Sequence, residues 1–230
     1  MDTPSLERLN KFLALQLGIS RRAADELIEK GDVTINSHVA TLGARFSPTD
    51  IIAVRGTPLA ATTPYQYFLF HKPAGYVCSR RQQGDTPTIY SLLPHALHHL
   101  KPVGRLDKDS SGLLVLTNDG DFAHQMTHPS YHKQKTYFVT LDHDLEPLHQ
   151  QMVSDFGVQL EDGTSKLLLT RESESSRRHW RIDMHEGRNR QIRRTFAALG
   201  YTVTQLHRTT FGNYSLGDIK PGAYKSIDIS

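Results

Sequence analysis

A break near the end of the first quarter of the chain constrains the fold more than any other feature of the sequence. Between Gly56 and Pro64 the chain carries glycine, two prolines and small residues, a composition typical of a linker. The chain has 230 residues, which is enough for one or two domains of ordinary size. The break therefore predicts a small domain over residues 1–57 and a larger domain over residues 66–230, joined by a linker over residues 58–65.

The segment before the break predicts two helices followed by a few short strands. Four leucines recur there at helical spacing, namely Leu6, Leu9, Leu13 and Leu17. They predict an amphipathic helix over residues 5–17. Ser20 is a favourable N-cap for a second helix over residues 21–30. Residues 33–39 predict a hairpin with a polar turn, and residues 50–54 predict a further strand.

The segment after the break predicts mixed strands and helices. Apolar or alternating runs predict strands at residues 67–70, 76–78, 113–117, 136–141 and 179–184. Helices are expected at residues 122–127 and 189–199. Because these elements are separated by hairpin-like turns and do not alternate regularly, the pattern favours an α+β fold over a doubly wound parallel sheet.

Composition excludes several classes of protein. Hydrophobic residues make up 37% of the chain and charged residues 22%, which is too apolar for a disordered chain. No apolar run approaches the roughly 20 residues that a membrane helix needs, and the first five residues lack the layout of a signal peptide. The single cysteine, Cys78, excludes an internal disulfide and a multi-cysteine zinc site. We therefore expect a cytoplasmic protein.

Positive charge is concentrated in the last third of the chain. The net charge is only +3, but residues 177–194 contain seven arginines against Asp183 and Glu186. Guanidinium groups offer planar paired donors that suit phosphate or carboxylate recognition. A solvated helix face is the alternative explanation for such a run.

A polar, glycine-containing segment over residues 104–112 leads directly into the apolar run 113–117. Asp107 within it is expected at the mouth of the core, where the environment tunes acidity. Chemistry alone leaves several interpretations open. Asp107 and Asp109 are candidates for a paired-carboxylate hydrolase site or for metal ligands, and Asp107 alone is a candidate nucleophile or base. A simple surface-turn aspartate is also compatible with the pattern.

Three segments of the first domain, residues 8–14, 20–28 and 31–36, resemble the S4-like RNA-binding domain. The resemblance implies docking on a structured RNA stem. Basic side chains beside a helix N-terminus are well placed for phosphate oxygens. The residues expected to make these contacts are Arg8, Lys11, Arg21 and Arg22.

In the second domain, Gly104-Arg105-Leu106-Asp107 resembles the central motif of the pseudouridine synthases, which isomerise uridine to pseudouridine in RNA. Residues 71–79, 135–137 and 186–194 resemble the other motifs of this family, in the family's order. The resemblance covers residues 5–225. It implies a catalytic domain with a mixed, mainly antiparallel sheet, an enzyme with Asp107 as its essential carboxylate, and no cofactor or metal.

The resemblance also implies roles for residues around Asp107. Arg193 is expected to pair with Asp107 and to hold it ionised. Tyr137 is expected to stack against the base and to relay the proton that leaves carbon 5. Ile192 is expected to contact the uracil ring, although a place in the core is equally compatible with its position.

A uridine within folded RNA has to be flipped out to reach such an aspartate. Arg105 is expected to fill the gap that the flipped nucleotide leaves. Further basic residues near the motifs are expected to bind RNA phosphates, and these are Lys72, Lys108, Arg188, Arg190 and Arg194.

The N-terminal domain and residues 75–79 point to the RsuA-type branch, which modifies small-subunit (16S) ribosomal RNA. Asn189-Arg190 looks more like relatives that modify large-subunit RNA, so a large-subunit target is the alternative. A non-catalytic ribosomal-RNA-binding or ribosome-assembly protein is a further alternative. We expect a monomer that acts on a ribosomal-subunit assembly intermediate.

Overall fold

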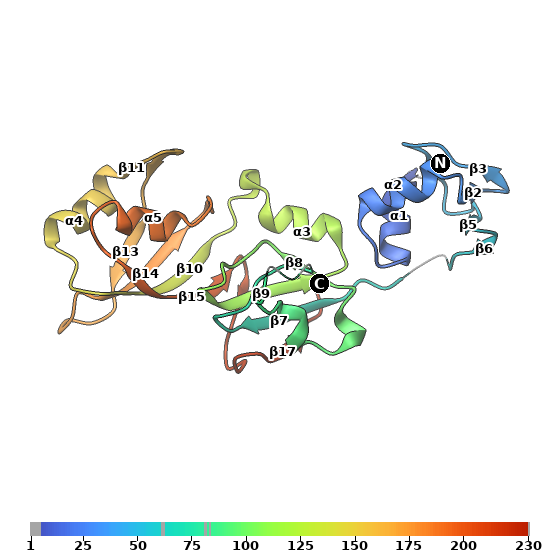
Figure 1. Cartoon of the computed structure of the whole chain (residues 1–230). Helices are drawn as coiled ribbons and strands as arrows, with labels where there is room; N and C mark the ends of the chain where they lie inside the picture. The colour runs from blue at the N-terminus through green and yellow to red at the C-terminus, as the bar shows by residue number, and fades with distance from the viewer. Residues whose placement is uncertain (1–5, 61–62, 81, 83, 230) are drawn as a thin grey trace. The chain divides into compact units, whose positions relative to one another are not determined.

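The computed structural model describes residues 6–60, 63–80, 82 and 84–229 (Figure 1). The chain forms two compact units, and the division between them falls between Gln66 and Tyr67. None of the helices within the described ranges has the length and apolar character needed to span a membrane.

The first unit begins with two helices, α1 (Leu9–Gln16) and α2 (Arg21–Glu29), as the sequence predicts. Helix α1 starts later than expected because the preceding strand, β1 (Glu7–Arg8), pairs with β4 (Arg45–Phe46). The Ser20 hydroxyl accepts a hydrogen bond of 3.1 Å from the Ala23 amide, which satisfies one free donor at the start of α2.

Four short strands complete this unit in the order β3–β2–β5–β6. Their bounds are Val33–Ile35 for β2, His38–Val39 for β3, Ile52–Val54 for β5 and Thr57–Pro58 for β6. Leu9, Phe12 and Leu13 of α1 are buried in one core with residues of α2 and the strands. The two helices therefore cover a small sheet, and the apolar spacing of α1 supplies the covering face.

The fold of the first unit continues into the segment that the sequence assigned to the linker. Pro58 belongs to β6 and aligns with Ala53 of β5, and the Leu59 amide donates to the Ile52 carbonyl oxygen at 2.8 Å. Proline is tolerated in an edge strand, where its missing N–H leaves no partner unsatisfied. Of the expected linker, residues 61–62 lie outside the described residues.

The second unit is built on a nine-stranded sheet whose main path is β13–β14–β10–β15–β9–β7–β17. Strand β16 pairs with β15, and β8 pairs with β9. Among the paired strands of this sheet, β15 and β9 are parallel and the others are antiparallel. The α+β class and the mixed, mainly antiparallel sheet are thus confirmed. The strand bounds are β7 Tyr67–Lys72, β8 Lys101–Val103, β9 Ser111–Thr117, β10 Lys135–Leu141, β13 Leu168–Arg171, β14 His179–Met184, β15 Val203–Phe211, β16 Tyr214–Ser215 and β17 Tyr224–Ser226.

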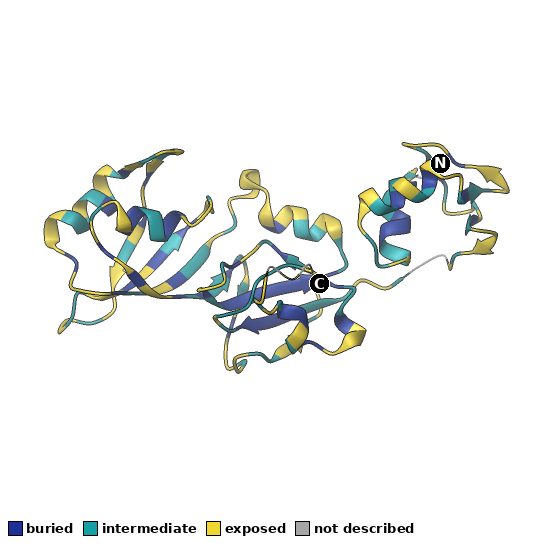
Figure 2. Ribbon diagram, viewed as in Figure 1, coloured by how far each residue is buried: buried dark blue, intermediate teal, exposed yellow. Residues whose placement is uncertain are grey.

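Strand β9 is buried on both faces, as the dark ribbon in Figure 2 shows. Leu114 and Leu116 pack into one core cluster, whereas Leu113 and Val115 pack into another. A continuous apolar run is what a strand covered on both faces requires. Helix α3 (Gly120–Thr127) packs in the second of these clusters through Met126.

Helix α5 (Gln191–Ala197) packs over the other half of the sheet (Figure 1). Phe196 of α5, Trp180 of β14 and Val139 of β10 share one core. The helix begins two residues later than predicted because Arg190 adopts a left-handed backbone conformation with φ of 47°. That conformation is incompatible with an earlier helical turn.

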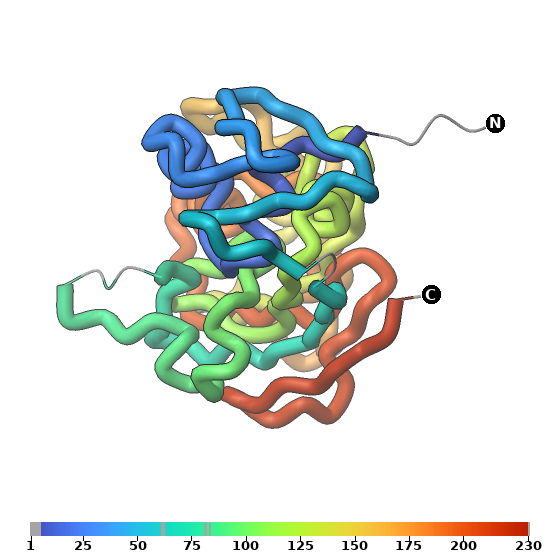
Figure 3. The backbone as a smooth tube through the Cα atoms, turned by 90° about the vertical axis from the view of Figure 1, so that its right-hand side faces the viewer, coloured from blue at the N-terminus to red at the C-terminus, as the bar shows by residue number. Residues whose placement is uncertain are grey.

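The remaining elements are short and lie outside the nine-stranded sheet. They are the 3-10 helices η1 (Ile89–Leu92), η2 (His95–Leu97) and η3 (Pro129–Tyr131), helix α4 (Pro147–Gln151), the π-helical turn η4 (Met152–Phe156), and the hairpin of β11 (Val158–Leu160) and β12 (Gly163–Ser165). The C-terminal segment, red in Figure 3, adds β17 to the edge of the sheet beside β7.

The strand predicted at residues 76–78 is wrong. Only an isolated bridge between Val77 and Thr88 forms there. The Val77 amide donates to Pro87 and the Val77 carbonyl accepts from Ile89, each at 3.0 Å. Residues 76–78 therefore meet the segment around Thr88 at a single bridge and do not pair along a neighbouring strand.

Candidate active site

A pocket of about 500 Å³ opens in the second unit, between the turn before β9 and the segment before α5. Strands β10 and β15 supply further wall residues, Tyr137 and Arg208 among them. The pocket brings together six of the residues that the sequence singled out, namely Arg105, Asp107, Tyr137, Arg188, Arg190 and Ile192. It is therefore the candidate active site.

Asp107 lies in a tight turn, in which the Asp107 carbonyl oxygen accepts a hydrogen bond of 3.1 Å from the Ser110 amide. Its carboxylate is partly exposed, and Oδ2 lies 3.6 Å from Nη1 of Arg190. Arg190 is the residue that precedes α5, and its backbone adopts the left-handed conformation there. Arg190 is therefore an ion-pair partner of the Asp107 carboxylate.

Arg193 has other partners than the sequence predicted. Its Nη1 donates to the Val203 carbonyl oxygen at 2.6 Å, and its Nη2 donates to the Asp109 carbonyl oxygen at 2.9 Å. Across the described ranges, the ion pair to Asp107 comes from Arg190. Arg193 thus fixes the backbone just after Asp107, because both terminal nitrogens of its guanidinium donate to backbone carbonyl oxygens. Burial, followed by the charge of Arg190, lowers the pKa of Arg193.

Lys72 does not face RNA phosphates, contrary to the sequence prediction. Its side chain is completely buried. Its Nζ donates to carbonyl oxygens of Ser110 at 2.6 Å, Asp107 at 3.0 Å and Pro73 at 3.1 Å. A buried cation needs such partners. Two of these carbonyl oxygens belong to the turn that carries Asp107, and the third belongs to Pro73, the residue that follows Lys72. Burial lowers the pKa of Lys72.

Tyr137 lies in the third position of β10, buried in the wall of the pocket. Ile192 belongs to the same core cluster as Tyr137 and also lines the pocket, so its position is compatible with a core role and with contact to a bound base. Directly across from Tyr137, on β15, lies Arg208. Arg208 lines the same pocket and is buried, and the sequence analysis missed it.

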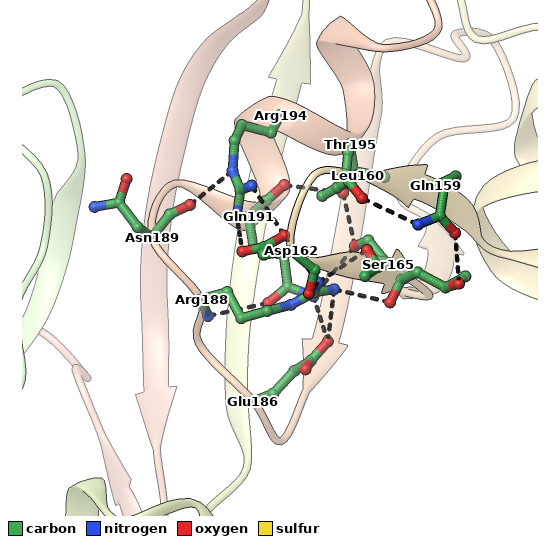
Figure 4. Close-up of polar contacts among 12 residues, drawn as sticks. Gln159, Leu160, Asp162, Ser165, Glu186, Arg188, Asn189, Gln191, Arg194 and Thr195 are labelled. Carbon is green, nitrogen blue, oxygen red and sulfur yellow. Dashed lines mark hydrogen bonds and ion pairs between the residues drawn. The ribbon is translucent and has the colours of Figure 1, made fainter.

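Arg188 and Arg194 are engaged by an aspartate that the sequence analysis overlooked (Figure 4). Both terminal nitrogens of Arg194 donate to the Asp162 carboxylate, at 3.0 Å and 2.6 Å. Arg188 Nη1 donates to Asp162 Oδ1 and to the Gly163 carbonyl oxygen, both at 3.0 Å. The hydrogen bond from Arg194 is the main reason that the pKa of Asp162 is lowered. These arginines thus bind the β11–β12 hairpin to the start of α5.

Arg105 is exposed on the turn next to Asp107 and lines the pocket. Lys108 is exposed as well, with its Nζ 3.3 Å from the Thr86 hydroxyl. Asp109 does not line the pocket, and its carbonyl oxygen is taken by Arg193. The arrangement therefore presents one carboxylate to the pocket from this turn, rather than the pair that a hydrolase site requires.

The basic residues of the first unit separate into two groups. Arg8 and Lys11 line a groove of about 840 Å³ together with Arg45, which the sequence analysis did not single out. Lys11 also lies 3.8 Å from Glu7. Arg21 and Arg22 are exposed at the start of α2 and do not line this groove.

Cys78 packs beside the turn, where its thiol donates to the Leu106 carbonyl oxygen at 3.4 Å. Burial raises the pKa of Cys78, so the thiol form is favoured. In the part of the chain that the structure describes, no three His, Cys, Asp or Glu side chains are grouped as metal ligands.

Family matches to both units define the class of this protein, an enzyme that acts on RNA. Residues 66–198 match the RNA pseudouridylate synthase family, and residues 7–52 match the S4 domain. The chain belongs to the RNA pseudouridylate synthase family.

Relatives match along nearly the whole chain. A ribosomal small subunit pseudouridine synthase A of Pasteurella multocida (strain Pm70) is 39% identical over 96% of this chain and 95% of its own length. A ribosomal large subunit pseudouridine synthase B of Bacillus subtilis (strain 168) is 35% identical over 96% of this chain and 92% of its own length. A crystal structure of a pseudouridylate synthase has a TM-score of 0.68 at 34% identity and covers 96% of each chain.

Proposed function

We propose that this protein isomerises one uridine to pseudouridine in small-subunit (16S) ribosomal RNA. The observation that carries the proposal is the carboxylate of Asp107, which faces a pocket with Arg190 at 3.6 Å and Tyr137 in its wall. A small-subunit enzyme is 39% identical and a large-subunit enzyme 35% identical over the same share of this chain, which supports the small-subunit target.

Asp107 is the reacting group in this proposal. The reaction breaks the bond from uracil nitrogen 1 to the ribose and forms a bond from carbon 5, and both routes to it use an ionised carboxylate. Asp107 either attacks the sugar at carbon 1′ or removes the proton from carbon 2′. Arg190 lies at ion-pair distance from this carboxylate, and Arg193 holds the backbone of the turn.

Tyr137 stacks against the flipped base and relays the proton that leaves carbon 5. Its place on a strand, rather than in a loop, fixes the ring relative to the Asp107 turn. Ile192 contacts the uracil ring from the start of α5. Together these two side chains form the apolar part of the base site.

RNA binding has to offset the unstacking of the flipped uridine, which costs a few kcal/mol. Arg105, exposed at the pocket, fills the vacated place in the RNA. The basic residues that bind phosphates are those of the first unit, Arg8, Lys11, Arg21 and Arg22. Three to five neutralised phosphates give a logarithmic salt slope of about −2 to −4. An affinity that does not change with salt contradicts phosphate binding.

The target is tested with purified RNAs and subunits. Protein-free 16S RNA, small-subunit assembly intermediates and 23S RNA are incubated with the enzyme, and pseudouridine is mapped by carbodiimide modification and primer extension. We expect one new site, in the small-subunit RNA and formed fastest in an assembly intermediate. A site confined to 23S RNA contradicts the proposed target.

We further propose that the protein acts as a monomer in the cytoplasm, where ribosomal RNA is assembled into subunits. The S4 domain supports RNA as the partner. Sedimentation equilibrium is expected to give the mass of one 26.0 kDa chain, and a dimer at working concentration contradicts this part of the proposal.

A further inference from the structure

Arg208 lines the candidate active site and has no role in the proposal above. On one side it aligns with Tyr137 of β10, and on the other side with Gly112 of β9. Gly112 follows the Asp107 turn, and a Cβ on it would lie 2.1 Å from the Arg208 carbonyl oxygen. Arg208 therefore lies between the strand of the stacking tyrosine and the strand that leaves the carboxylate turn.

The Arg208 side chain is held in place but not neutralised. The residue is only 2% exposed. Its Nε donates to the Leu113 carbonyl oxygen at 2.9 Å, and its guanidinium carbon lies 4.7 Å from the centre of the Phe211 ring. Its Nη2 is buried and has no hydrogen-bond partner. None of the ion pairs within the described ranges involves Arg208.

A buried guanidinium without a carboxylate is energetically unfavourable, and it does not escape by losing its proton. Such a group in a pocket indicates that negative charge arrives there during function. Lys135 adds a second cation to the same pocket wall. Burial, followed by the charge of Arg208, lowers the pKa of Lys135. The pocket is lined by five cationic residues, Arg105, Lys135, Arg188, Arg190 and Arg208, against two carboxylates, Asp107 and Glu186. Its positive charge therefore exceeds its negative charge.

The reaction supplies the missing negative charge on the base. When the bond between nitrogen 1 and carbon 1′ breaks, both electrons stay on nitrogen 1, and uracil becomes an anion whose charge spreads to oxygens 2 and 4. Carbon 5 then uses an electron pair of this anion to bond carbon 1′, and the proton on carbon 5 leaves to a base. Whichever route Asp107 takes, uracil passes through this anionic state.

We propose that Arg208 is the cation that stabilises and retains the detached uracil anion between bond cleavage and bond formation. This inference rests on the proposed function. A preorganised charge in a site closed to water acts more strongly than the same charge in water. The ligand is uracil rather than a backbone phosphate because Arg208 is buried beside Tyr137, the residue proposed to stack on the base.

The test compares Arg208→Gln and Arg208→Lys with wild type and with the control Arg171→Gln, which removes an exposed arginine from β13. Thermal unfolding and RNA affinity are measured first. Single-turnover cleavage of the bond at nitrogen 1 is then timed for RNA with uridine or 5-fluorouridine at the target. Fluorine withdraws electrons and makes uracil a better leaving anion, so it relieves the need for a stabilising cation.

For Arg208→Gln we expect cleavage with uridine about 100-fold slower than wild type. With 5-fluorouridine we expect the defect to shrink to about 10-fold, and RNA affinity and the control variant to stay unchanged. Arg208→Lys keeps the charge, so its rate is expected within about 10-fold of wild type. If Arg208→Gln does not fold, the Arg208→Lys variant decides. A cleavage rate within about 10-fold of wild type then supports the inference, and a larger loss overturns it.

Equal defects with both bases, or a wild-type rate in folded Arg208→Gln, overturn the inference. Weaker RNA binding with an unchanged cleavage rate also overturns it and makes Arg208 a phosphate ligand. A wild-type enzyme that cleaves neither RNA contradicts the proposed function itself, which separates the two failures.

Discussion

The buried ammonium group of Lys72 lies 3.0 Å from the carbonyl oxygen of Asp107. The same group lies 2.6 Å from the Ser110 carbonyl oxygen, on the other side of the turn. The Lys72 ammonium group therefore donates hydrogen bonds to backbone oxygens on both sides of the turn that carries the carboxylate. Lys72 thereby holds the backbone of the turn from which the Asp107 side chain extends.

Replacing Lys72 by methionine is expected to destabilise the second unit by about 3 kcal/mol, because buried carbonyl oxygens lose their donor. Activity is expected to fall with it, since the turn is no longer held. Urea unfolding measures the change in the free energy of unfolding. Lys108→Met, at an exposed site, is the control and should change it by less than about 0.5 kcal/mol. Equal stability of the two variants contradicts this role for Lys72.

Gly112→Ala is expected to destabilise the protein by about 3 kcal/mol or more. Gly112 has a φ of +111°, and an added Cβ would meet the backbone oxygen and nitrogen of Arg208 at 2.1 Å and 2.5 Å. Backbone atoms cannot move aside as a flexible side chain can. Gly120→Ala, in open space at the start of α3, is the matched control. Thermal unfolding of both variants decides, and equal melting temperatures refute the predicted clash.

Asp162→Asn is expected to loosen the β11–β12 hairpin, because Arg188 and Arg194 lose the carboxylate that they share. The lowered pKa of Asp162 means that its contribution is present above 3.8 and is lost as pH falls through the folded-state value. Amide hydrogen exchange at Thr164 and Ser165 should accelerate in the variant. Asp155→Asn, which alters an exposed carboxylate on η4, should leave these rates unchanged, and unchanged rates in Asp162→Asn would contradict the clamp.

His207 predicts a stability change on the acid side of neutrality. Burial, followed by the charge of His71, lowers its pKa from 6.5. Between that lowered pKa and 6.5 the unfolded chain binds more protons than the folded chain, so stability falls as pH drops through this window. His207→Gln should flatten that part of the pH dependence in urea unfolding. An unchanged slope argues against this coupling, and His179→Gln, at an exposed site on β14, should keep the wild-type slope.

Elements with one strong local signal were predictable from the sequence. Residues 179–184 form β14 with the predicted bounds because apolar and polar residues alternate without interruption. Strand β15 was missed, although it joins the two halves of the sheet. Its pairing with β10 shifts register beside Thr136 and beside Thr140, and such irregularities break the period of two on which prediction depends.

The candidate site shows the same limit. Local motifs singled out Asp107 and Tyr137, which the structure brings into one pocket. The partners of the basic residues were not predictable, because they depend on contacts between distant segments. Asp162 lies 32 positions from Arg194, and Lys72 lies 38 positions from Ser110. No local spacing encodes such pairs, so charged residues that the fold uses internally resembled free RNA ligands.

The central claim is that the Asp107 carboxylate performs the isomerisation. The most direct measurement maps pseudouridine in small-subunit RNA by carbodiimide modification and primer extension, after incubation with wild type, Asp107→Asn or Asp109→Asn. The account predicts one new site with wild type and with Asp109→Asn, and no such site with Asp107→Asn while its RNA affinity persists. Formation of the site by Asp107→Asn at the wild-type rate would contradict it.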